Sequence, residues 1–149
     1  MTLDEVYRGN DISFRYPGHW ERGEESRDDA VTISVGDLGA FWSVTVLRRR
    51  PKAERVLEEA IQAFEDEYDE VDQYPVGATL GGESGLGKNL EFVALELINC
   101  VMLRAVEVGG RTYFVMAQVT DHERDQFEPI FEAISASLEF APDSEILIQ

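Results

Sequence analysis

The sequence contains few of the side chains that form disulfides or metal sites. Its 149 residues include one cysteine, Cys100, and two histidines, His19 and His122. A single thiol cannot form an internal disulfide, and no Cys and His cluster with zinc spacing is present. We therefore expect a fold held together by its hydrophobic core, with no metal and no cofactor.

Positive charge is also scarce. Thirteen Lys and Arg stand against thirty Asp and Glu, which gives a formal net charge of −17. Such a surface repels phosphate backbones and anionic lipids. We expect no nucleic acid and no membrane among the partners.

Long apolar runs and a basic N-terminus are missing. No uncharged stretch exceeds about ten residues, whereas a helix that crosses a membrane needs about twenty. Residues 1–5 are acidic and lack the basic and apolar regions of a signal peptide. These features predict a cytoplasmic protein and leave open a leader removed before Met1.

A large apolar fraction is present instead. Hydrophobic residues make up 44% of the chain and aromatic residues 10%, which suits a single globular domain over residues 1–149. Residues 12–16 alternate apolar and polar and then stop at Pro17-Gly18, which predicts a strand and a turn. Residues 31–35 and 40–47 predict a hairpin with its loop at 36–39.

Two segments have helical periodicity. Apolar residues recur every three or four positions over residues 53–69, which predicts an amphipathic helix lying on a sheet. A second helix is predicted over residues 125–139. Both Thr120-x-x-Glu123 and Asp125-x-x-Glu128 match a capping box at its start, and we favour Asp125.

The segment between the helices is the most apolar part of the chain. A glycine turn is predicted near residues 85–88, followed by strands at 90–97 and 101–108, which either join near Asn99 or run on as one bent strand. The pair Gly109-Gly110 predicts a tight hairpin into residues 112–120. Apolar residues occur on both faces of this last strand, so the sheet should be covered on both sides. The apolar tail, residues 145–148, either packs on the core or adds an edge strand.

The order of elements places the chain in the α+β class, with a largely antiparallel sheet and helices layered on it. Two stretches then resemble PsbP-like domains. One is residues 7–20, with a strand, Pro17-Gly18 and Trp20 in that order, and the other is the Gly-Gly hairpin followed by Phe127-x-x-Ile130-Phe131-x-x-Ile134.

That superfamily includes a photosystem II extrinsic subunit, Ran-binding proteins and bacterial adaptor chaperones of type VI secretion effectors. The resemblance implies an α/β/α sandwich whose members mostly bind other proteins. It offers no shared catalytic residue, and the short, unsignalled bacterial adaptors are the most similar in length and charge.

Motifs that could carry chemistry are weak. Residues 82–89 nearly spell a phosphate-binding loop, but Asn89 stands where a Ser or Thr must reach magnesium. A glycine turn between strands is the better interpretation. His19 and His122 fall in predicted loops without a nucleophile or base beside them, and no calcium-loop pattern occurs among the thirty carboxylates.

The charges of the first helix run against its macrodipole. The basic residues Arg48, Arg49, Arg50, Lys52 and Arg55 precede or begin it, and the acidic residues Glu65, Asp66 and Glu67 end it. A helix prefers anions at its start and cations at its end, by about 0.3–1 kcal/mol per charge. We interpret the two ends as a docking surface for a partner or for a second copy of the chain. The plain alternative is that solvent screens them.

Two functions follow as hypotheses. The first is a non-enzymatic protein-binding or adaptor module, and by resemblance an adaptor chaperone would receive apolar helices of a client on an exposed sheet face. Candidates for that face, or for ordinary core, are Phe41, Trp42, Val44, Val46, Phe92 and Leu95. The second is a small-molecule binder or a carboxylate-using enzyme with a cleft between sheet and helix.

Overall fold

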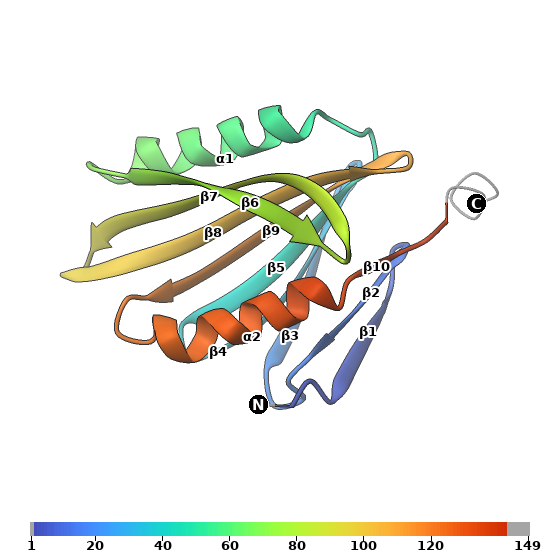
Figure 1. The fold of residues 1–149 in the computed structure, drawn as a ribbon, viewed down its shortest axis with the longest axis horizontal. Helices are drawn as coiled ribbons and strands as arrows, with labels where there is room; N and C mark the ends of the chain where they lie inside the picture. The colour runs from blue at the N-terminus through green and yellow to red at the C-terminus, as the bar shows by residue number, and fades with distance from the viewer. Residues whose placement is uncertain (1, 143–149) are drawn as a thin grey trace.

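The computed structural model describes residues 2–142 (Figure 1). In chain order the elements are β1 (Glu5–Gly9), β2 (Ile12–Tyr16), β3 (Glu21–Arg27), β4 (Ala30–Asp37), β5 (Ala40–Leu47), α1 (Ala53–Glu67), β6 (Asp72–Leu80), β7 (Glu83–Ala94), β8 (Leu97–Val108), β9 (Arg111–Thr120), α2 (Arg124–Ala136) and β10 (Glu139–Phe140). The α+β class predicted from the sequence is confirmed.

A seven-stranded antiparallel sheet forms the centre of the fold, in the order β3-β4-β5-β9-β8-β7-β6. Helix α1 covers one face over β7, β8 and β9. Helix α2 and a small sheet, ordered β1-β2-β10, cover the other face (Figure 1). The arrangement is the α/β/α sandwich that the resemblance implied.

Strand β9 shows why both faces are covered. Its residues Tyr113, Val115, Ala117 and Val119 are buried in the core cluster that includes α2. The alternate residues Phe114 and Met116 pack against the second cluster, beneath α1. Successive side chains of a strand point to opposite faces, so one apolar strand serves two cores, as predicted.

Trp42 belongs to the first core and not to a surface. Its side chain is fully buried, beside Phe14 at a ring-centroid distance of 4.9 Å. Its indole Nε1 donates a 2.9 Å hydrogen bond to Ser135 Oγ of α2. Val44 and Val46 are buried in the same core. Inward-facing positions alternate along β5, which makes Trp42 a core residue and removes it from the docking candidates.

Both helices are shorter than predicted. Helix α1 ends at Glu67, and Tyr68 already has an extended backbone. Helix α2 begins at Arg124, and neither predicted capping box forms, because its N-cap Glu123 makes no side-chain cap hydrogen bond. At the other end the chain leaves the helix at Ser137 and pairs β10 with β2. This pairing ends α2 three residues before the predicted position, and tail residues 145–148 lie outside the described residues.

Two turns lie elsewhere than predicted. The β6–β7 turn is at Gly81-Gly82, and residues 85–88 are inside β7. Gly85 is needed there because a Cβ at that position would lie 2.2 Å from the backbone oxygen of Ala105. The β7–β8 turn is at Leu95-Glu96, not near Asn99. The Gly109-Gly110 hairpin and the hairpin of β4 with β5 are confirmed.

Strands β1, β3, β6 and β10 were not predicted as separate elements. Every residue of β3 is exposed, so it carries no alternating apolar signal. Strand β6 contains Pro75 and Gly77, two residue types that disfavour the interior of a strand and so predict a loop. Both β3 and β6 are edge strands, where such residues are tolerated.

Candidate functional site

The basic side chains at the start of α1 already have partners within the fold. Arg49 Nε lies 2.5 Å from an Asp29 carboxylate oxygen, and Arg50 lies 3.8 Å from Glu107. Arg48 donates to the side chain of Asn10 at 3.1 Å, and Arg55 pairs with Glu59 at 3.0 Å. Lys52 is the N-cap of the helix and is exposed. Local carboxylates therefore compensate much of the charge that runs against the helix dipole.

The acidic residues at the far end of α1 are all exposed. Glu65 accepts a 3.4 Å hydrogen bond from Gln73 of β6, and Asp66 accepts one of 2.8 Å from Gln62. Glu67 ends the helix. The two charged groups of the predicted docking surface thus lie at opposite ends of α1, and their role as one surface stays a prediction.

Exposed apolar side chains gather at one end of the central sheet. The register aligns Phe41, Gln118, Val101 and Leu90 in one row across β5, β9, β8 and β7. Beyond that row lies the tip of the β7–β8 hairpin, whose large exposed apolar residues are Val93, Leu95, Leu97 and Ile98. We call these four residues the apolar end.

The β7–β8 turn projects from this end, at the left of Figure 1. Leu95 at its tip is 95% exposed and Val93 is 66% exposed. Leu95 and Glu96 have φ angles of 54° and 65°, a left-handed conformation that such residues rarely adopt. Of the sequence candidates for an exposed apolar face, Leu95 alone is fully exposed, whereas Phe92 is buried and Phe41 is half-buried.

Carboxylates lie along one side of the apolar end. Tyr68 stacks on Phe92 at 4.1 Å and so fixes the segment after α1 against β7. This segment supplies Asp69, Glu70 and Asp72, which share a surface hollow of about 440 Å³ with Val93 and Ile98. The tip of the β7–β8 hairpin is therefore an apolar projection, which we call the β7–β8 knob. The three carboxylates beside it, Asp69, Glu70 and Asp72, are called the acidic rim.

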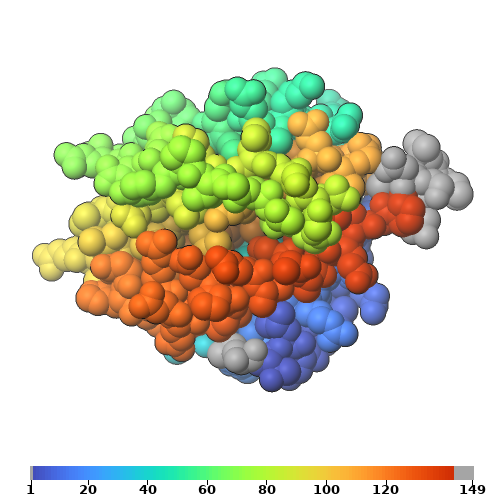
Figure 2. Space-filling model, viewed as in Figure 1, coloured from blue at the N-terminus to red at the C-terminus, as the bar shows by residue number. Residues whose placement is uncertain are grey.

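A cleft of about 370 Å³ lies between α2 and the sheet. Within the central sheet, helix α2 packs on β9 and β6, the strands on either side of β8 and β7, and so bridges a hollow above those two strands. Figure 2 shows β8 between the edge of β6 and the helix. The lining includes Tyr74, Asn89, Cys100, Met102 and Phe131.

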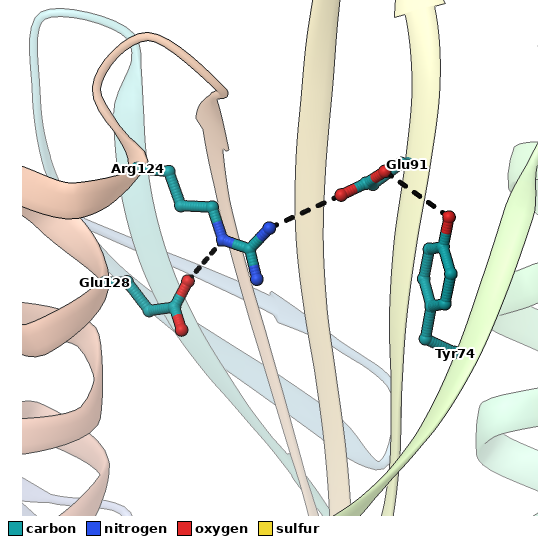
Figure 3. A network of polar contacts seen from close by, with 4 residues as sticks. All are labelled: Tyr74, Glu91, Arg124 and Glu128. Carbon is teal, nitrogen blue, oxygen red and sulfur yellow. Dashed lines mark hydrogen bonds and ion pairs between the residues drawn. The ribbon is translucent and has the colours of Figure 1, made fainter.

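A network of polar contacts crosses one side of this cleft (Figure 3). Arg124 Nε donates to Glu128 at 2.6 Å, and Arg124 Nη1 lies 3.4 Å from Glu91. The Tyr74 hydroxyl donates to Glu91 at 3.5 Å. The hydrogen bond to Glu128 raises the pKa of Arg124, and the Glu91 charge raises the pKa of Tyr74.

Arg104 of β8 does not line this cleft but contacts Asn89, which does. Its Nη1 donates to Asn89 Oδ1 at 2.9 Å and to the backbone oxygens of Leu103 and Lys88 at 2.9 and 3.3 Å. Burial lowers the pKa of its guanidinium. Burial also raises the pKa of the Cys100 thiol, which keeps it protonated and unreactive near neutral pH.

The cleft that the second hypothesis required is present, and two carboxylates, Glu91 and Glu128, line it. Glu91 and Glu128 converge on Arg124 instead of on open space. The side chains of His19 and His122 are 58% and 76% exposed, outside the cleft. Residues 82–89 run through a turn into β7 without opening a helix, so the phosphate-loop pattern carries no such site.

No protein-family model and no curated protein matches the sequence. Solved structures match in fold. A protein of Bacteroides thetaiotaomicron VPI-5482 is 10% identical with a TM-score of 0.66 over 96% of this chain, which spans 50% of that protein's length.

Cyanobacterial PsbP (CyanoP) of Synechocystis sp. PCC 6803 is 12% identical with a TM-score of 0.62 over 91% of each chain. LpqN of Mycobacterium tuberculosis, involved in cell envelope biogenesis, is 16% identical with a TM-score of 0.53, over 88% of this chain and 83% of LpqN. At these identities the matches show the fold, which is PsbP-like. Among residues 2–142, neither helix has the length and apolar character needed to span a membrane.

Proposed function

We propose that the chain is a protein-binding module and that the apolar end of its sheet docks the partner. One observation carries this proposal. Among the described residues, seven large apolar side chains are exposed, and four of them lie together on the β7–β8 hairpin, where Val93 pairs with Ile98 and Leu97 follows the Leu95-Glu96 turn. Contiguous exposed apolar residues disfavour solubility, and in soluble proteins they are typical of interaction sites.

The charges around the apolar end indicate the chemistry of the partner. Asp69, Glu70 and Asp72 border it, and the whole chain has a net charge of −17. A complementary surface is an apolar recess with a basic rim, which the β7–β8 knob can enter. This chemistry suits another protein better than a second copy, because a two-fold contact through the apolar end would place acidic rim against acidic rim.

Support also comes from the fold and from the earlier resemblance. The chain shares its fold with PsbP and LpqN, and the adaptor chaperones that the sequence resembles bind client proteins. We propose the same general role here, in the cytoplasm, with the charged ends of α1 as a secondary contact. The sequence led us to expect the partner on an exposed face of the sheet. The proposed docking site is instead the apolar end.

The test compares the effect on partner binding of substitutions at two exposed leucines, one in the β7–β8 turn and one within β7. Wild-type protein captures partners from host extract, and a captured partner is then purified and titrated against Leu95→Glu and Leu86→Glu. Leu86 is 45% exposed and lies at the opposite half of β7. We expect Leu95→Glu to weaken the purified complex at least about ten-fold, as for a central interface residue, and Leu86→Glu to change it less than about two-fold.

Ionic strength gives a second readout. Affinity of the purified complex should fall as salt rises from about 50 to 300 mM, since rim carboxylates contact basic groups. Equal binding by wild type and Leu95→Glu would overturn the proposal. So would a stable dimer in light scattering that Leu95→Glu dissolves, because the occupant would then be a second copy.

A further inference from the structure

The cleft beneath α2 and the hollow beside the apolar end are continuous. Glu91 of β7 lines both of them. It stands opposite Asp72 of β6, which belongs to the acidic rim, and opposite Cys100 of β8, which lines the cleft. The surface proposed for docking therefore extends from the β7–β8 knob, past Glu91, into the space under the helix.

Cross-strand pairs of β7 and β8 form the path between the two hollows. Val93 pairs with Ile98 at the knob, and Asn89 pairs with Met102 in the cleft. Residues two apart on a strand face the same side of the sheet, so these two pairs and the pair of Glu91 between them share one face. Val93 and Asn89 are four residues apart, a distance of about 13 Å along the strand.

Apolar surface along this path is left uncovered by the fold. Of the seven large apolar side chains that are exposed in the described part of the chain, four form the apolar end and a fifth, Tyr74, lines the cleft. Inside the cleft Met102 is only half-buried, whereas Val119 and Phe131 beside it are buried. An apolar side chain from another molecule would complete the contacts that Met102 lacks.

The charges along the path favour a cation. Five carboxylates line the two hollows, namely Asp69, Glu70, Asp72, Glu91 and Glu128. Arg124, which pairs with Glu91 and Glu128 (Figure 3), is the one cation among the lining residues that the structure describes. The acidic rim is exposed, and no ion pair joins it to another residue of the described chain. Its charge remains available to a positively charged side chain.

The size of the cleft decides between a helix and an extended segment as the occupant. Its volume is about 370 Å³, whereas one helical turn, about 10 Å across and 5.4 Å long, occupies about 420 Å³. The cleft is therefore too small for a helix. In an extended segment alternate side chains point the same way at intervals of about 6.6 Å, which is also the spacing of the three strand pairs.

We propose that the partner docks an extended segment with the pattern apolar-x-basic-x-apolar. One apolar side chain contacts Val93 and Ile98, the lysine or arginine lies at Glu91 beside the acidic rim, and the other apolar side chain enters the cleft against Met102. Apolar burial supplies affinity, and the charge sets the register. This inference rests on the proposed docking function and adds the chemistry and spacing of the segment that docks.

Synthetic peptides test the pattern directly. The probe is Leu-Ser-Lys-Ser-Leu, acetylated and amidated so that the lysine carries its only charge. Binding is followed by backbone amide shifts of the full chain. We expect a dissociation constant of about 1 mM or below, with shifts in β7, β8 and the first half of α2.

Three further peptides change one feature each. Leu-Ser-Glu-Ser-Leu should bind at least about ten-fold more weakly, because its carboxylate meets the acidic rim. Leu-Ser-Lys-Ser-Ser should lose at least about ten-fold with one apolar contact. Leu-Lys-Ser-Ser-Leu keeps the composition and places the lysine on the opposite face, and should bind at least about five-fold more weakly.

Variants of the protein locate the contacts. Glu91→Gln should reduce the preference for lysine over glutamate in the peptide, and Glu58→Gln, at an exposed position on α1, should leave it unchanged. Met102→Trp fills the cleft and should abolish the advantage of Leu-Ser-Lys-Ser-Leu over Leu-Ser-Lys-Ser-Ser. Folding of each variant is read from its own amide spectrum, and the Glu91→Gln result stands if Met102→Trp does not fold.

Absence of probe binding, equal binding of Leu-Ser-Lys-Ser-Leu and Leu-Lys-Ser-Ser-Leu, or shifts that avoid the cleft would overturn the inference. Titration of the purified partner separates this failure from failure of the docking site. A complex lost in Leu95→Glu but unchanged in Glu91→Gln and Met102→Trp would retain the apolar end and refute the extended segment. A complex unchanged in all three variants would refute both.

Discussion

Arg111 and Asp11 form an ion pair that is almost wholly removed from solvent. Arg111 Nη2 lies 2.9 Å from Asp11 Oδ2, and the side chains are 10% and 11% exposed. The Nε and Nη1 of Arg111 are buried without a hydrogen-bond partner in the described part of the chain. Among residues 2–142, Asp11 is thus the carboxylate that pairs with this guanidinium, where β9 meets the β1–β2 turn.

Replacing Asp11 by Asn should therefore destabilise the fold strongly. Asn keeps the shape and tolerates the φ of 67° at this turn position, so the change removes mainly the charge. We expect the free energy of unfolding to fall by about 3 kcal/mol, as when a buried pair loses one member. Urea unfolding followed by tryptophan fluorescence measures the loss.

A solvent-exposed pair provides the control. Glu25 and Arg27 lie 3.3 Å apart with side chains 67% and 79% exposed. Glu25→Gln should cost less than about 1 kcal/mol, because solvent screens the pair. A loss in Asp11→Asn no larger than in Glu25→Gln would contradict the prediction.

Single residues were predictable from the sequence where burial alone decides their place. Cys100 in its apolar run is buried, and both histidines are exposed. The contact between Arg124 and Glu91 was not predictable, because it joins residues 33 positions apart. It depends on where β7 turns, which the sequence misplaced, and on how α2 then packs over β7.

At the scale of elements, the β7–β8 turn combines strain with exposure. Both Leu95 and Glu96 have left-handed backbones, each of which costs a residue with a Cβ about 1 kcal/mol or more. Two-residue turns of this kind favour Asn-Gly. Replacing Leu95-Glu96 by Asn-Gly should raise the free energy of unfolding by about 1–2 kcal/mol.

Leu95→Ala separates strain from side-chain loss. It removes the same exposed side chain and keeps the strained backbone, so stability should change by less than about 0.5 kcal/mol. Both variants should lose partner binding if the apolar end is the docking site. An Asn-Gly variant no more stable than Leu95→Ala would show that the turn stores no strain.

This turn explains why the sequence pattern failed there. Turn prediction depends on Gly, Asn, Asp and Pro, and Leu95-Glu96 contains none of them. The pattern therefore moved the turn to Asn99. The turns at Gly109-Gly110 and between β4 and β5 carry glycine and were predicted. Sequences often break local preferences where function requires it, and this break falls at the apolar end.

At the scale of the whole molecule, the sequence predicted the layers of the fold better than the residues at which its helices and strands begin and end. Apolar residues on both faces of β9 required two covering layers, and two amphipathic helices were present to supply them. The α/β/α sandwich itself came from the PsbP-like resemblance. A cleft between sheet and helix was one of two hypotheses, but its position beneath α2 could not be predicted, because it arises from how α2 bridges β9 and β6 and leaves no periodic signal.

The net charge of −17 should make stability depend on salt. Repulsion among surface carboxylates disfavours the compact state, and its range falls from about 30 Å at 10 mM salt to about 8 Å at 150 mM. The melting temperature should therefore rise by about 3–6 °C between these conditions, which corresponds to about 1–2 kcal/mol for a chain of this size. Differential scanning calorimetry measures the shift.

The matched variant carries Glu21→Lys and Glu58→Lys, two exposed positions on β3 and α1. Each replacement changes the charge by two, so the net charge moves from −17 to −13. Its melting temperature should be higher at 10 mM salt and should respond less to added salt, because less repulsion remains to be screened. Identical salt dependence in both proteins would mean that salt acts through apolar burial and not through the net charge.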